Sequence, residues 1–375
     1  MAKRANMKGY KKLLLAAVGN YGGWFNAHAH IDRADTLDER YLAHKSMDPI
    51  EASSYPLSVK QSMTGDLHTG PAYEKEDLER RMDEMLDLMK GLGVRRLDSF
   101  IDVTGDRVKL TALDVALELK KKYEGEVDFR PAAYPIFGFK DSDPERWELF
   151  VEGAKKADYI GTLPERDARP HHIGYDEHMR RVIALGQKLK KEVHMHVDQA
   201  NDPRERGTET LIEAVRWLGS PETPESKEGR PSVWAVHSIS PSTYDEDRFR
   251  RMLDGLLEHN IGVICCPIAA ISMRQLRPIS TPTYNSIARV LEMAEAGVNV
   301  AVGSDNIWDV YVPTGTPDMS EEFCVLSNAV RFYYPDILAK IGTGTHLNDM
   351  DRALISRALD QDREVWERIK KEMKG

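Results

Sequence analysis

Short apolar runs rich in β-branched residues alternate along the chain with longer stretches whose apolar positions recur with a helical period. The apolar runs predict eight strands, at residues 24–30, 94–103, 127–136, 158–163, 192–197, 232–237, 262–266 and 299–305. The stretches between them predict amphipathic helices, among them residues 74–92, 110–122, 173–190, 208–218, 245–259 and 283–296. Strands that alternate with helices in this way predict an α/β fold, a parallel sheet closed as a (β/α)8 TIM barrel. A doubly wound open sheet is the alternative, although no Gly-x-Gly-x-x-Gly follows the first strand.

Three further segments lie outside this alternation. A short helix is expected before the first strand, and residues 32–73 form a long loop that proline and glycine interrupt. Connections of this length are usually functional or disordered, so the loop is either a lid over the barrel mouth or a plain surface excursion. From about residue 323 the pattern is helical and ends in a charge-rich stretch at 349–374. Residues 1–375 are therefore expected to form a single barrel domain with a helical C-terminal extension.

The composition narrows the choice of partners. Hydrophobic residues make up 41% and charged residues 30% of the 375 residues, as in a globular protein with a large core. The net charge of -9 argues against nucleic acid and an anionic membrane surface as partners, and no apolar stretch is long enough to span a bilayer. The three cysteines form no disulfide framework and favour a reducing cytoplasm. A small-molecule substrate is the expected partner, and a homo-oligomer stays open.

Polar residues gather where the predicted strands end, which is where (β/α)8 barrels place their chemistry. In chain order they are His28, His30, Asp102, His194, His196, Asp198, His237 and Asp305. Side chains alternate along a strand, so His28 and His30 point to the same face, as do His194 and His196. Imidazole and carboxylate groups that converge at one edge of a sheet are ligands for a divalent metal, Zn2+ or Fe2+.

Four of these residues also have an ordinary structural interpretation. His28 and His30 fit a solvated loop, and His237 fits a histidine satisfied within the core. Asp305 fits the cap of the following helix. All of these interpretations would have to hold at the same end of the barrel, so the residues taken together favour a metal site.

Several sequence stretches resemble those of a known group. His196-Val197-Asp198-Gln199 is similar to the His-x-Asp-Glu of cytosine deaminases, and Gly303-Ser304-Asp305-Asn306 is similar to the start of their eighth-strand loop. Leu163-Pro164-Glu165 and Ala133-Tyr134-Pro135 also find counterparts there. Over residues 25–319 the chain resembles the amidohydrolase superfamily, in its cytosine deaminase-like branch.

The resemblance implies a ligand set and roles for its neighbours. His28, His30, His196 and Asp305 would hold one divalent metal ion, with Zn2+ favoured and Fe2+ the alternative. Asp305 would also take the proton of the bound water, and His237 would steady that water or the developing oxyanion. No lysine ends the fourth predicted strand, which favours a mononuclear site over a lysine-bridged one. Whether His194 also contacts the metal is left open.

One departure from the resemblance concerns proton transfer. Gln199 stands where these deaminases carry a proton-shuttling glutamate, and an amide cannot exchange a proton near neutral pH. One option is that another acid protonates the leaving group, either His237, Asp305 or Asp198. The other option is a leaving group that departs without such help.

The substrate pocket is expected to differ as well. Ile136 and Phe137 stand where the cytosine enzymes place a glutamine that reads the pyrimidine edge, which predicts a more apolar substrate than cytosine. Asp198 and Trp308 are further candidates for substrate contact. Most deaminases of this branch also wrap a small β-sandwich around the barrel, whereas this chain is expected to have the barrel without it.

These observations predict a metal-dependent hydrolase that acts on a C–N bond of a small, heterocyclic substrate, by deamination or by amide or amidine hydrolysis. Catalysis would depend on His237, Asp305 and Gln199. One alternative is a dehalogenating or alkylamine-releasing hydrolase of the same group. Another is a catalytically silent barrel that binds a metal and a ligand.

Overall fold

The structure is a computed structural model, and it describes residues 9–272 and 287–373. Its strands form one sheet in the order β1-β2-β3-β4-β5-β6-β7-β8, and all neighbouring strands in that order are parallel. Their bounds are β1 Trp24–Ala29, β2 Val94–Asp102, β3 Asp128–Tyr134, β4 Tyr159–Thr162, β5 Val193–Val197, β6 Val233–His237, β7 Ile261–Cys265 and β8 Val300–Val302. This is the topology of a (β/α)8 barrel, so the predicted fold class is confirmed.

The barrel closes where the chain beyond β8 meets the end of β1. The Asp305 amide donates to the His28 carbonyl (2.9 Å), and the His30 amide donates to the Asp305 carbonyl (3.3 Å). Gly303 permits this approach, because a Cβ at that position would lie 2.6 Å from the Cβ of His28. The last strand is therefore shorter than the predicted 299–305, and Asp305 lies on the seam between the first and last strands.

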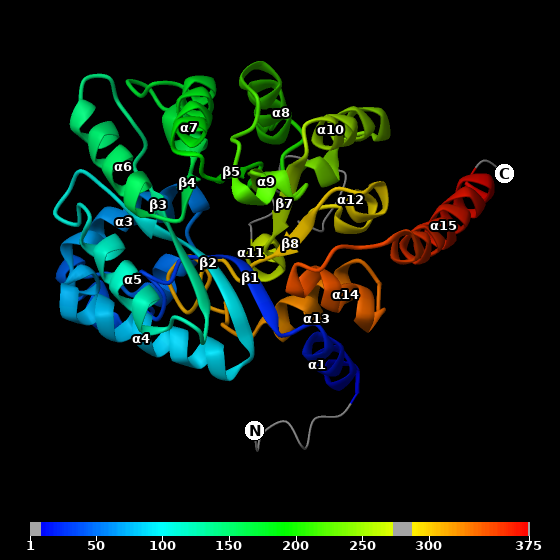
Figure 1. The fold of residues 1–375 in the computed structure, drawn as a ribbon, viewed down its shortest axis with the longest axis horizontal. Helices are drawn as coiled ribbons and strands as arrows, with labels where there is room; N and C mark the ends of the chain where they lie inside the picture. Colours follow the sequence, from blue (N-terminus) through cyan, green and yellow to red (C-terminus); the bar gives the residue numbers. More distant parts are fainter. Residues whose placement is uncertain (1–8, 273–286, 374–375) are drawn as a thin grey trace.

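Helices surround the barrel (Figure 1). Those that come after β2 and before β8 are α5 Thr111–Lys122, α6 Pro144–Lys156, α7 Tyr175–Leu189, α8 Gly207–Leu218, α9 Pro224–Lys227, α10 Glu246–Glu258, α11 Pro267–Ile271 and α12 Val290–Ala296. The helix predicted at 283–296 is thus shorter, and its first residues, 283–286, lie outside the described part of the chain. Three of these helices, α6, α9 and α11, were not predicted from the sequence.

The connection between β1 and β2 is largely helical rather than a loop. It contains η2 Glu39–Tyr41, η3 Ala43–Lys45, α2 Pro49–Ser53, α3 Leu57–Thr69, η4 Pro71–Tyr73 and α4 Lys75–Gly91. Pro49 and Pro71 take the first positions of helical turns, where a missing amide hydrogen costs nothing. These prolines therefore begin helices, although in the sequence they read as breaks.

The core lies inside the barrel and between the barrel and its helices. Every residue of β4, β5 and β7 is buried, as expected for parallel strands that are covered on both faces. Each outer helix buries one stripe; α7, for example, buries Met179, Val182 and Ile183. This rigid frame fixes where the strand ends project their side chains.

The two ends of the chain add helices outside the barrel. Near the N-terminus, α1 Tyr10–Asn20 packs on α14 Pro335–Thr343 and α13 Met319–Ala329. The last helix, α15 Asp349–Glu372, contacts α12, and its end extends away from the barrel (Figure 1). Within residues 9–272 and 287–373, no helix combines the length and the apolar character needed to cross a bilayer.

Candidate metal centre and substrate cavity

Four buried side chains converge at the C-terminal end of the barrel strands. His28 belongs to β1 and His30 follows it, His196 belongs to β5, and Asp305 follows β8; their ligand atoms all lie within 4.8 Å of one another. His28 Nε2 and His30 Nε2 lie 3.4 and 3.5 Å from Asp305 Oδ1. His196 Nε2 lies 3.0 Å from His28 Nε2. Three nitrogens and one carboxylate oxygen around one point form the donor set of a divalent metal site.

The protonation states of these groups suit metal binding. Burial lowers the pKa of His30 and of His196 well below the usual range. Burial raises the pKa of Asp305, but its hydrogen bond with His28 and nearby positive charge outweigh that effect and lower this pKa overall. Neutral imidazoles and an ionised carboxylate are the forms that bind a metal ion.

His237 and Tyr134 flank the cluster. The His237 Nε2 lies 3.9 Å from Asp305 Oδ2, and burial lowers the pKa of His237 to about 4, so its ring is neutral near pH 7. The Tyr134 hydroxyl lies 3.1 Å from His196 Nδ1 and so helps to orient that ring. His237 and Asp305 both have positive φ angles, 77° and 58°, a strained backbone conformation that clusters at functional sites.

A cavity of about 300 Å³ adjoins the cluster. Of the residues predicted for the site, those that line it are His30, Ile136, His196, Gln199, His237 and Asp305. Helix α3 contributes Leu57, Lys60 and Gln61 to the wall, so the connection after β1 covers one side of the barrel mouth. The volume is at the small end of the range for ligand sites and suits a small molecule.

Three residues predicted to contact substrate do not line this cavity. The Asp198 carboxylate accepts hydrogen bonds from the first backbone amides of α8, at 2.6 and 2.7 Å, and thereby holds that helix start. The Phe137 ring faces His68 of α3, with 5.3 Å between the ring centroids. Trp308 is half-buried, and its carbonyl accepts backbone amides from the connection after β1. In this structure all three support the frame around the cavity.

Gln199 lines the cavity and donates its side-chain amide to the Glu165 carboxyl group. Burial and the neighbouring Glu205 raise the pKa of Glu165 well above its usual range, and burial raises the pKa of Glu205 to about 7. The second carboxyl oxygen of Glu165, Oε1, is buried and has no hydrogen-bond partner among the described residues. A carboxyl group with a raised pKa therefore lies one hydrogen bond behind the amide, at a place that the linear sequence does not reveal.

Two cations that the sequence pattern did not single out also line the cavity. Arg33 is 2% exposed and its Nη2 contacts His30 Nδ1, whereas Nε and Nη1 have no hydrogen-bond partner among the described residues. Lys60 donates to the main-chain carbonyls of Tyr311 (2.6 Å) and Ser53 (3.3 Å). The only sequence signal for Arg33 was its position three residues after His30, and Lys60 had none.

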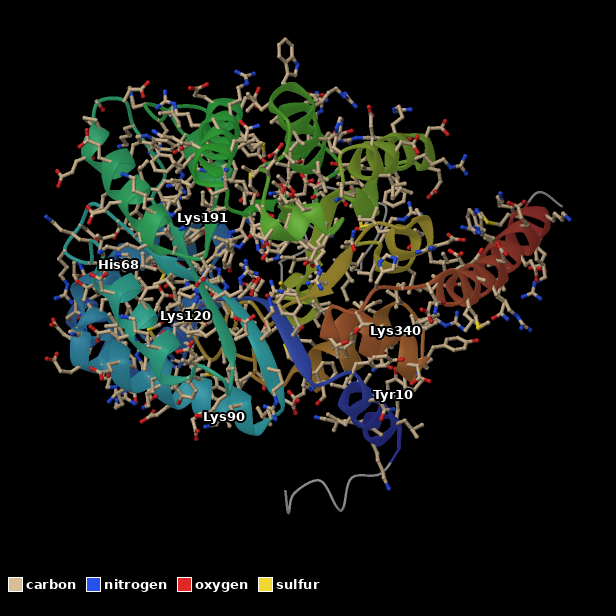
Figure 2. The ribbon with its side chains drawn as sticks, in the orientation of Figure 1. Tyr10, His68, Lys90, Lys120, Lys191 and Lys340 are labelled. Carbon is tan, nitrogen blue, oxygen red and sulfur yellow. The ribbon has the colours of Figure 1, made fainter. Side chains whose placement is uncertain are left out.

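A buried polar network ties α3 to the end of β2. The Tyr73 hydroxyl lies within hydrogen-bond distance of Asp102 (2.7 Å) and of Asp32 (3.0 Å), and Asp102 also bonds to His68 (3.1 Å). Burial lowers the pKa of His68, but hydrogen bonds to Asp102 and Asp106 outweigh it and raise this pKa to about 9. His68, labelled in Figure 2, is therefore a buried cation that anchors the helix covering the cavity.

His194 lies outside the four-residue cluster, toward the start of β5. With Asp98 and Glu192 it forms a second group of potential metal ligands, and its Nε2 lies 3.3 Å from Glu192 Oε2. The Asp98 carboxylate pairs with Arg96 and Arg130 (3.1 Å each), and Glu192 pairs with Arg130 (3.3 Å). Because the two arginines neutralise these carboxylates, this group is an ion-pair network.

Comparison by sequence finds distant relatives. No family model matches the chain. An uncharacterized protein of Haemophilus influenzae is 26% identical over 294 residues, which cover 77% of this chain and 97% of that protein. A pterin deaminase of Rhizobium rhizogenes is 21% identical over 286 residues, which cover 75% of this chain and 61% of the deaminase. The chain thus matches less than two thirds of the length of that deaminase.

Solved structures share the fold. A 5-methylcytosine deaminase from Klebsiella pneumoniae has a TM-score of 0.71 and 22% identity, over 88% of this chain and 74% of that one. An N-isopropylammelide isopropylaminohydrolase from Burkholderia multivorans has a TM-score of 0.64 and 18% identity, also over 88% and 74%. This chain shares the fold of these two enzymes. The resemblance predicted from the strand-end motifs is therefore confirmed at the level of the fold.

Proposed function

We propose that this protein is a metal-dependent hydrolase that cleaves a C–N bond of a small heterocyclic substrate, by deamination or by hydrolysis of a cyclic amide or amidine. The observation that carries the proposal is the buried cluster of three imidazoles and one carboxylate beside a small cavity. The fold shared with a 5-methylcytosine deaminase and the pterin deaminase among the sequence relatives support this reaction class.

The residues fit one divalent metal ion. His28, His30 and His196 offer nitrogen atoms and Asp305 offers an oxygen, and all four side chains are buried. This donor set suits Zn2+, which we propose as the resident metal, and it is compatible with Fe2+. When bound, such an ion lowers the pKa of water from about 15.7 towards about 7 and so supplies hydroxide at neutral pH.

The protein's own groups position the substrate and move protons. Asp305, which is ionised, takes the proton of the attacking water. His237, which is neutral, hydrogen-bonds the oxygen at the carbon under attack. Gln199 forms a hydrogen bond with a ring nitrogen of the substrate, and the carboxyl group of Glu165, whose pKa burial raises, lies next to that position.

The amide of Gln199 supports two alternatives to simple deamination. Because it cannot release a proton, a leaving group that needs less protonation is one variant, and the isopropylaminohydrolase with this fold supports loss of an alkylamine. The same feature supports a barrel that binds metal and ligand without turnover. A dehalogenating reaction belongs with the first variant, since a halide leaves without a proton.

Metal analysis and product-release assays test the proposal. The protein purified with Zn2+ is expected to hold about one metal ion per chain, as mononuclear hydrolases do. It is expected to release ammonia, an amine or a halide from a panel of aminopyrimidines, triazines and pterins. His30→Ala is expected to lose both metal and turnover, whereas His44→Ala, which alters an exposed histidine outside the cluster, is expected to keep both.

Each alternative has its own outcome in these assays. Full metal content without release from any compound, even after Gln199→Glu, supports the silent barrel. Failure to retain any divalent metal contradicts the proposal as a whole.

We also propose a cytoplasmic location. Cys265, Cys266 and Cys324 are unpaired, and free thiols persist in a reducing compartment. Fractionation of cells that express the protein, with a cytoplasmic marker as control, tests this proposal; recovery from a secreted fraction would contradict it.

A further inference from the structure

We propose that the substrate is an anion, a nitrogen heterocycle that carries a carboxylate held by Arg33 and Lys60. The inference rests on the proposed function and narrows it to a class of substrate. It is based on the charge and the unused hydrogen-bond donors of these two side chains. Both line the same cavity as residues of the proposed metal site.

Arg33 is a buried cation with unused donors. Its side chain is 2% exposed, and within the described residues neither Nε nor Nη1 has a hydrogen-bond partner. The ion pair with Asp102 is long, 3.8 Å from Nη1 to Oδ2, which is beyond hydrogen-bond distance. Buried donors are rarely left unpaired because the loss of their bonds to water is costly. These donors therefore point to an acceptor that a ligand provides.

The remaining guanidinium nitrogen loses its partner when His30 binds a metal. Nη2 of Arg33 contacts His30 Nδ1, whereas His30 turns Nε2 towards Asp305. A neutral imidazole that binds metal through Nε2 carries its proton on Nδ1, so it cannot accept a hydrogen bond from Arg33. In the metal-loaded protein Arg33 thus needs an acceptor, and a carboxylate matches its planar fork of donors.

Lys60 brings a second cation to the same part of the cavity from α3. It is 8% exposed, donates to two main-chain carbonyls, and forms no ion pair within the described residues. Tyr311 links the two cations, since the Arg33 guanidinium lies 5.0 Å from its ring centroid and Lys60 Nζ lies 2.6 Å from its carbonyl oxygen. A carboxylate beside Tyr311 would meet both positive charges.

The cavity wall contains two basic side chains and one acidic side chain among the described residues. Arg33 and Lys60 are the basic residues, and Asp305 the acidic residue, among the described residues that line it. Asp305 is a ligand of the cluster, so a divalent ion there would more than offset its charge. Charges in such a desolvated site select strongly for an anion.

Matched ring compounds test the charge directly. Protein loaded with Zn2+ is titrated with cytosine-5-carboxylate and cytosine-5-carboxamide, and with pterin-6-carboxylate and pterin-6-carboxamide, by calorimetry at low salt. Within each pair the shapes are nearly equal, so the difference in dissociation constant measures the effect of charge. At least one carboxylate is expected to bind about 10- to 100-fold more tightly than its carboxamide, and the preference is expected to shrink with added salt.

Variants assign the preference to its residues. Lys60→Met is expected to reduce the carboxylate preference about 10-fold while leaving carboxamide affinity unchanged, since it removes one charge and keeps the apolar stem. Arg33→Lys keeps the positive charge but removes the planar pair of N–H donors, so it is expected to weaken carboxylate binding as well. Lys45→Met is the matched control, because Lys45 pairs with Asp66 and does not line the cavity. Metal content and circular dichroism confirm that each variant is folded.

The outcomes separate this inference from the proposed function. Equal affinity for carboxylate and carboxamide in both pairs overturns it, and so does a preference that Lys60→Met and Arg33→Lys leave unchanged. A carboxylate preference without turnover supports the anion site and contradicts the proposed hydrolase. Turnover of uncharged rings without a carboxylate preference supports the hydrolase and contradicts the anion site.

Discussion

Replacement of Gln199 by glutamate tests whether a carboxyl group at this position supplies the proton that the leaving group needs. The side-chain amide of Gln199 donates to Glu165, so Gln199→Glu places two carboxyl groups side by side. Two carboxylates about 4 Å apart repel each other by ~4 kcal/mol at an effective dielectric constant of about 20, which corresponds to about 3 pKa units. Burial already raises the pKa of Glu165, so the pair is expected to hold one shared proton at neutral pH.

That proton would lie at the edge of the cavity, where the leaving group needs it. For a substrate that releases ammonia, we expect Gln199→Glu to raise kcat/KM about 10²-fold, the lower end of the range for general acid–base catalysis. Steady-state ammonia release across neutral pH measures this change, with metal content and Tm as controls.

A double variant checks the coupling between the two groups. Adding Glu165→Gln to Gln199→Glu removes the repulsion and lowers the pKa of the introduced carboxyl group. The alkaline limb of the pH–rate profile is therefore expected to move to lower pH. If fully metal-loaded Gln199→Glu were no faster than the natural protein, proton supply would not limit the reaction and the reasoning would be refuted.

Further predictions concern the metal cluster and the network beside it. His28→Ala is expected to abolish metal retention in a folded barrel, as elemental analysis and circular dichroism would show; normal metal content would contradict the ligand set. Asp305→Asn is expected to reduce kcat by several orders of magnitude, because it removes a ligand and a base together; a loss below about tenfold would exclude that double role. His237→Ala is expected to keep metal and lose turnover, and parallel loss of both would make His237 a ligand. The raised pKa of His68, about 9, stabilises the fold by ~3 kcal/mol below pH about 6.5, and this stabilisation is lost as pH rises through 9. Urea denaturation of His68→Gln is therefore expected to depend less on pH in that window, and an unchanged dependence would rule the contribution out.

The barrel was predictable because strands buried on both faces produce continuous apolar runs, as in β5 and β7. The helix α6 was missed because its buried face consists of Phe150, Gly153 and Ala154, and small residues give a weak periodic signal. The connection at 32–73 was predicted as a loop because proline reads as a break. Its helices depend on burial against the barrel, which the sequence pattern of that segment does not encode.

The same distinction applies to the site. His28, His30 and His196 lie in or beside strands, where the alternation of side chains places them without further information. Lys60 reaches the cavity only because α3 folds over the barrel mouth and meets the loop after β8 at Tyr311. The role of Glu165 likewise follows from its contact with Gln199. The two residues come after different strands, β4 and β5, and no local sequence pattern connects them.

A metal ion bound at the seam between β1 and β8 would stabilise the barrel in addition to its part in the reaction. His28 and His30 lie on one edge of the seam and Asp305 on the other, so a bound ion would link the first and last strands of the barrel. Without it, that junction depends on the backbone hydrogen bonds of Asp305 and on the hydrogen bonds that the Asn26 side chain forms with the hydroxyl and the backbone amide of Ser304. Amide hydrogen exchange in a chelator should accelerate at β1 and β8 before it does at β4 and β5. A cell starved of the ion would then accumulate a protein that is open to proteolysis as well as inactive.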